Sequence, residues 1–80
     1  LPIYLTIDLN WFDPSLVPGT GTPEPGGYFW DDFELLIKCF KQFNLIGADI
    51  VELAPHIDLS GVSSIVASKV ARSLIMTLDK

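Results

Sequence analysis

The chain has 80 residues, of which 49% are hydrophobic and 19% are charged, and its formal net charge is −5. This length allows one domain at most, and a single cysteine excludes an internal disulfide framework and is typical of a reducing, cytoplasmic compartment. No uncharged apolar run approaches the ~20 residues that cross a bilayer, so we expect no membrane partner. The high apolar content favours a piece of a larger α/β protein, or a chain that covers its surface by oligomerising.

Acidic residues dominate the first part of the sequence. Residues 1–37 contain six acids and no base, whereas residues 38–80 contain five bases and four acids. Such a surface does not suit a polyanion, so nucleic acid is not an expected partner. A cation is the partner that this charge distribution favours.

Residues 3–10 are predicted to form a buried strand, because they are mostly apolar on both faces and rich in β-branched and aromatic side chains. The polar residues Asp8 and Asn10 come only at its carboxyl end, where open parallel sheets bind ligands. Residues 11–29 are too rich in proline and glycine for regular structure. Because they also contain several aromatic residues, we interpret them as an ordered loop over a site.

A helix is predicted to follow this loop. Asp31 or Asp32 is its expected N-cap, and Asp31 and Glu34 have capping-box spacing. Its core-facing side is expected to carry five apolar residues at helical spacing: Phe33, Leu36, Ile37, Phe40 and Phe43.

The rest of the chain is predicted to form a strand and a helix. Residues 45–54 are a second buried strand, which Pro55 stops, and Ser60 is expected to cap the last helix. The order β-loop-α-β-α predicts two parallel strands in an α/β fold. Two strands are too few for a stable parallel sheet, so we expect the isolated chain to aggregate or to associate with a complementary piece.

Two motifs lie at the ends of these predicted strands. The first is Thr-Ile-Asp-Leu-Asn-Trp-Phe-Asp-Pro over residues 6–14, continued by Pro-Gly-Thr-Gly-Thr-Pro-Glu-Pro-Gly-Gly over residues 18–27. The other is Asp-Ile-Val-Glu-Leu-Ala-Pro over residues 49–55, followed by His-Ile-Asp-Leu-Ser. Together they resemble the ureohydrolase family, which includes arginase, agmatinase, guanidinobutyrase and formimidoylglutamase, and the motif over residues 49–60 is most similar to agmatinase. The resemblance implies that residues 1–80 are a carboxyl-terminal fragment of such a domain, a β-loop-α-β-α piece of a three-layer α/β/α parallel-sheet fold.

The resemblance also implies an activity. The parent enzyme would hydrolyse a guanidino C–N bond of an agmatine-like compound to urea and an amine, as in polyamine biosynthesis. Members of the family use a binuclear metal site, usually manganese with other divalent metals possible, whose bridging hydroxide attacks the guanidinium carbon. By position, Asp8 would bridge the metals, and Asn10 would occupy the second ligand place, on the same face of the strand. Glu52 would pair with the substrate guanidinium, and Thr22 would be an active-site loop residue.

Two departures from the family pattern favour an alternative, a catalytically silent remnant or interaction module of the same fold. The family has aspartate where this chain has Asn10, whose amide brings no charge, so the second metal should be held more weakly. The family's other ligands, a histidine and a His-x-Asp-x-His cluster, lie upstream, and His56 is at none of those positions. We therefore expect the isolated chain to be inactive, and the protein to be cytoplasmic and to form a homo-oligomer or bind its missing N-terminal part.

These residues also have purely structural interpretations. Asp8 could cap the loop by accepting backbone N–H groups. Asn10 and Asp13 are typical turn residues beside Pro14, and for Asp13 we prefer that role. Glu52 lies in the predicted apolar strand, where an unpaired carboxylate is costly, which favours a functional role over a buried ion pair.

Overall fold

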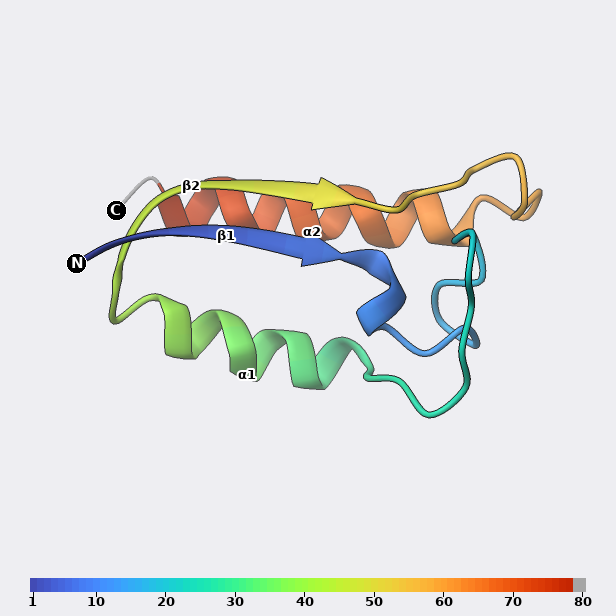
Figure 1. The fold of residues 1–80 in the computed structure, drawn as a ribbon, viewed down its shortest axis with the longest axis horizontal. Coiled ribbons are helices and arrows are strands. Elements are labelled where there is room, and N and C mark those ends of the chain that lie inside the picture. The colour runs from blue at the N-terminus through green and yellow to red at the C-terminus, as the bar shows by residue number, and fades with distance from the viewer. Residues whose placement is uncertain (79–80) are drawn as a thin grey trace.

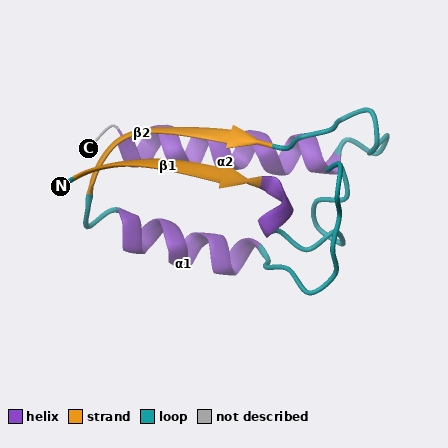
Figure 2. Ribbon diagram, viewed as in Figure 1, coloured by secondary structure: helices purple, strands orange, loops and turns teal. Residues whose placement is uncertain are grey.

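The structure, a computed structural model, describes residues 1–78, and these form two parallel strands, two α-helices and a short 3-10 helix (Figures 1 and 2). The elements are β1 (Pro2–Asp8), a short 3-10 helix η1 (Leu9–Trp11), α1 (Trp30–Phe40), β2 (Asn44–Val51) and α2 (Val62–Leu78). The predicted α/β class and element order are thereby confirmed. Neither helix in this part of the chain is long and apolar enough to cross a membrane.

The two strands run in register, so they end together. Pro2 of β1 pairs with Asn44 of β2, and Asp8 pairs with Val51, with one irregularity between Ile3 and Tyr4. The loops that leave the strands after Asp8 and Val51 therefore start side by side at the carboxyl edge of the sheet.

Both helices pack on the same face of the sheet. Side chains from β1, η1, the loop after η1 and both α-helices form one buried cluster, against which Ala48 and Ile50 of β2 pack. Its members are Ile7, Leu9, Phe12, Val17, Phe33, Ile37, Val66, Ala67, Val70 and Leu74. Burying a large apolar side chain contributes about 1.5–3 kcal/mol, so this cluster is the main source of stability.

The opposite face of the sheet is open, which corrects the prediction that both faces of each strand are apolar and buried. Side chains alternate along a strand, and the outward ones of β1 include the exposed Tyr4 and Thr6. The Tyr4 hydroxyl donates to the Asp49 carboxylate at 3.0 Å, and this hydrogen bond raises the pKa of Tyr4. Residues 1–78 thus form two layers of the predicted three-layer fold.

The helix starts differ from the predicted ones. Phe29 is the N-cap of α1, and Asp32 acts from the first turn by accepting the Phe29 backbone N–H at 2.9 Å. The prediction placed the acid at the cap because the hydrophobic pattern does not show that Trp30 is already helical. Ser60 does accept a helix N–H, that of Val62 at 3.2 Å, although Gly61 separates it from the first helical residue.

Candidate functional site

Asp8 is the last residue of β1 and the N-cap of the 3-10 helix that follows it. Its carboxylate Oδ1 accepts the backbone N–H of Asn10 at 2.9 Å and so caps η1. Asn10 consequently lies in the 3-10 turn, and the prediction that residues 8 and 10 share one face of a strand is wrong. Within residues 1–78, the second Asp8 oxygen accepts no hydrogen bond.

Asn10 lies against the glycine-rich loop. Its Nδ2 donates to the Thr22 hydroxyl at 2.9 Å, so two of the predicted site residues are brought together. The amide oxygen, Oδ1, is buried and has no partner among the described residues. An unsatisfied buried polar atom costs about 1–3 kcal/mol, and a bound cation or donor would remove that cost.

Glu52 follows β2 directly and lies next in sequence to Val51, the partner of Asp8. Its φ is 73°, and no other non-glycine residue in the described chain has a positive φ. This left-handed conformation ends the strand three residues before the predicted end, and it leaves the side chain exposed instead of buried. Such a backbone costs about 1–3 kcal/mol and is typical of functional positions.

The loop over this edge is held in place by Asp13. Its carboxylate accepts the backbone N–H and the hydroxyl of Ser15 and the N–H groups of Gly26 and Gly27. These hydrogen bonds, the Ser15 hydroxyl above all, lower the pKa of Asp13 to about 2. The predicted structural role of Asp13 and the ordered character of the loop are confirmed.

A second set of hydrogen bonds, which no local sequence pattern predicts, joins the loop to α2. The Gly19 N–H donates to the buried Ser63 hydroxyl at 2.7 Å, and that hydroxyl donates to Asp58 Oδ2 at 2.7 Å. Hydrogen bonds from Ser60 and Ser63 lower the pKa of Asp58 to about 2. The Ala54 N–H also donates to the Gly19 carbonyl at 2.7 Å. The loops that follow β1 and β2 are therefore one connected structure.

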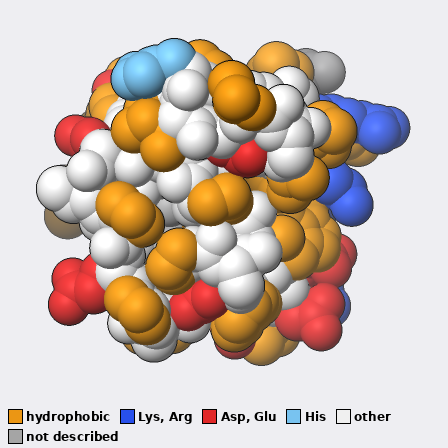
Figure 3. Space-filling model, turned by 90° about the vertical axis from the view of Figure 1, so that its right-hand side faces the viewer, with side chains coloured by type: hydrophobic (Ala, Val, Ile, Leu, Met, Phe, Trp, Pro, Cys, Tyr) orange, Lys and Arg blue, Asp and Glu red, His pale blue; other side chains and the backbone are white. Residues whose placement is uncertain are grey.

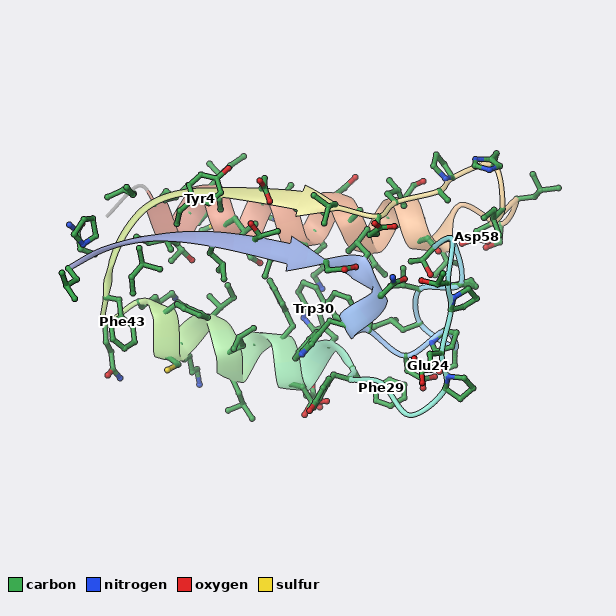
Figure 4. All side chains as sticks on the ribbon, in the orientation of Figure 1. Tyr4, Glu24, Phe29, Trp30, Phe43 and Asp58 are labelled. Atoms are coloured by element: carbon green, nitrogen blue, oxygen red, sulfur yellow. The ribbon has the colours of Figure 1, made fainter. Side chains whose placement is uncertain are left out.

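The carboxyl edge of the sheet forms one end of the molecule. Figure 4 shows Asp58, Glu24 and Phe29 at this end, with Tyr4 and Phe43 at the other. The end-on view in Figure 3 shows acidic side chains interspersed with hydrophobic ones over this surface. Trp11 stacks on Tyr28 with ring centres 4.5 Å apart, which ties the two ends of the loop together.

The ligand set at this edge is incomplete for a metal centre. In the part of the chain that the structure describes, no three His, Cys, Asp or Glu side chains lie together as metal ligands. The edge offers two hard oxygen donors, the Asp8 carboxylate and the unpartnered Asn10 amide oxygen, and such donors suit manganese or magnesium. Further ligands would have to come from outside residues 1–78, because the exposed His56 lies on the loop after β2 and belongs to no such group.

Comparison with known proteins gives a consistent result. A sequence model of the arginase family matches residues 1–77. The agmatinase of Sodalis glossinidius is 41% identical over 75 residues, which are 94% of this chain and 24% of that protein. The proclavaminate amidino hydrolase of Streptomyces clavuligerus superposes with a TM-score of 0.90 at 34% identity, over 96% of this chain and 26% of that one. The agmatine ureohydrolase of Thermoplasma volcanium superposes with a TM-score of 0.84 at 33% identity, over 98% and 26%. The chain spans about a quarter of the length of the relatives it matches.

Proposed function

The chain belongs to the arginase family, and on this premise we propose that it is the carboxyl-terminal part of a ureohydrolase that cleaves an agmatine-like guanidino compound to urea and an amine. The observation that carries the proposal is the arrangement at the carboxyl edge of the sheet. The register puts Glu52 directly after the strand partner of Asp8, and a hydrogen bond joins Asn10 to Thr22. Relatives that are named agmatinases support the choice of substrate.

Each of these residues has a proposed role. Glu52 binds the substrate guanidinium, because an exposed carboxylate can accept two parallel N–H bonds from a guanidinium group. Asp8 and Asn10 would hold manganese through oxygens that have no protein partner in the described chain, and the bond from Asn10 Nδ2 to Thr22 would leave Oδ1 as the atom available to the metal. When bound, the metal supplies positive charge that lowers the pKa of water.

We propose that the 80 residues alone are inactive, because the described residues provide two metal-ligand oxygens and no further ligand group. The working protein would be cytoplasmic and would be completed by upstream residues or by other copies of itself. Its partner would be a small guanidino compound, not a membrane or a nucleic acid.

A chimera tests this proposal. The matching 75 residues of the Sodalis glossinidius agmatinase are replaced by those of this chain, and urea release from agmatine and bound manganese are measured. We expect a folded, active chimera in which Glu52→Gln lowers the activity at least about tenfold, since one ionic hydrogen-bonding pair is worth about 1.5–3 kcal/mol. The control is Glu24→Gln, which removes an exposed loop carboxylate that no strand end positions.

The second candidate is a catalytically silent module, which the neutral Asn10 favours. The same chimera separates the two candidates through Asn10→Asp. If the unmodified chimera folds but releases no urea and binds at most one manganese, while Asn10→Asp restores the second metal and the activity, then the silent module is correct. Equal metal content in both chimeras, with urea released by both, supports the hydrolase.

A further inference from the structure

A groove of about 460 Å³ separates α1 from α2 on the helical layer. On α1 its lining residues are spaced by three or four positions, as in Trp30, Phe33 and Ile37. On α2 the same spacing relates Lys69, Arg72 and Met76, so each helix turns one face to the groove. The volume lies in the range of small-molecule sites, about 300–1,000 Å³.

Basic residues gather on this groove. Four of the five bases in the sequence line it: Lys38 and Lys41 from the side of α1, and Lys69 and Arg72 from α2. Glu34 is the one acidic residue in the lining, and no carboxylate in the described chain forms an ion pair with any of the four. Each helix side carries two like charges three residues apart, which is mildly unfavourable. In a protein with a net charge of −5, this local excess of positive charge favours binding of an anion.

The bottom of the groove is apolar and aromatic. Phe33 and Ile37 are buried beneath it, and Met76 is 64% exposed although it is a large apolar side chain. Lys69 Nζ lies 4.7 Å from the centre of the Trp30 ring, so a cation and an aromatic face are already next to each other. A flat apolar group would cover the exposed carbon surface and leave the bases free to bind a charged group.

We propose that the α1–α2 groove is an accessory binding site for a small aryl phosphate, with the ring on the apolar floor and the phosphate among Lys38, Lys41, Lys69 and Arg72. A phosphate carries nearly two charges at neutral pH and has several acceptor oxygens, which suits four cations better than a single carboxylate would. The groove draws on no residue of the carboxyl edge, so this site is independent of the proposed hydrolase activity.

The test titrates phenyl phosphate into the folded chimera described above and follows the indole N–H signals assigned to Trp30 and Trp11 by NMR. Trp30 lies in the groove, whereas Trp11 stacks on Tyr28 and serves as an internal reference. We expect a saturable shift of the Trp30 signal alone, weakened by added salt. Replacing Lys69→Gln and Arg72→Gln together should lower the affinity about fivefold to tenfold, as for two solvent-exposed ionic contacts.

A matched variant controls for overall charge. Ile57→Glu with Leu59→Glu changes the net charge by the same amount on a loop outside the groove, at positions that are 51% and 93% exposed. It should leave the affinity within about twofold, since distant exposed charges are screened.

Several results would overturn the proposal. One is the absence of a saturable Trp30 shift, and another is an equal shift of Trp11. Inorganic phosphate binding as tightly as phenyl phosphate would show that the apolar floor has no role. Unchanged affinity in the Lys69 and Arg72 variant would show that the anion does not bind in the groove. Self-association that this variant abolishes would show that a second copy of the chain fills the groove.

Discussion

The hydrogen bonds around Ser63 give a sharp test of how the loops of the candidate site are held. The Ser63 side chain is completely buried, accepts the Gly19 N–H and donates to Asp58, each at 2.7 Å. In Ser63→Ala, the buried Gly19 N–H would lose its hydrogen-bond acceptor. The cost of leaving such a donor unsatisfied is about 1–3 kcal/mol, and the higher helix propensity of alanine recovers only about 0.5 kcal/mol.

The expected loss in free energy of unfolding is therefore ~1.5 kcal/mol, a large share of the stability of so small a domain. Urea unfolding followed by tryptophan fluorescence measures this loss, and a thermal scan should show the midpoint lowered by roughly 6–12 °C. Hydrogen exchange at the Gly19 amide reports the same bond directly, and its protection should fall.

Ser68→Ala is the matched control on the same helix. The Ser68 hydroxyl is exposed and donates only to the Ser64 carbonyl one turn earlier, so its removal should change stability by no more than about 0.5 kcal/mol. The reasoning is refuted if Ser63→Ala costs no more than Ser68→Ala, or if the Gly19 amide keeps its protection.

Three further predictions concern the loop, the stability at low pH and the exposed Ile46 at the irregularity of β2. Gly27→Ala should destabilise the folded chain by about 1–3 kcal/mol, because the added Cβ would lie 2.6 Å from the Asp13 backbone nitrogen. Gly21→Ala is the control, because a Cβ there would have no atom within 4 Å. Equal thermal midpoints of the two variants would contradict the prediction. Asp13 and Asp58 have pKa values lowered from 3.8 to about 2, so their contribution is present above about pH 4 and is lost as the pH falls towards 2. The thermal unfolding midpoint should therefore decrease as the pH is lowered from about 4 to about 2. Replacing both residues by Asn should make this decrease smaller, and an equal decrease in the variant would contradict the prediction. Ile46 is 63% exposed, and we expect self-association by sedimentation that Ile46→Lys weakens. A monomer at every concentration would contradict this prediction. The unfolding experiments should be carried out below the concentration at which self-association begins.

The order and type of the elements, and the family, could be predicted from the sequence alone. Hydrophobic periodicity is a local property, so the β-loop-α-β-α order could be recognised without the structure. The two motifs that contain Pro14 and Pro55 sufficed to indicate the arginase family. The turn at Asp13 was also predictable, because an Asp-Pro pair favours a turn through contacts within a few residues, but its bonds to Gly26 and Gly27 were not.

The ends of the strands and the contacts of the loops could be seen only in the folded chain. The ends of β1 and β2 depend on a side-chain cap by Asp8 and on the left-handed backbone of Glu52, and hydrophobic patterns report neither. The bond from Gly19 to Ser63 joins residues 44 positions apart, and the four bases of the groove come from two helices. The folded chain creates such contacts, because packing two helices on one face of the sheet brings together residues that are not neighbours in the sequence.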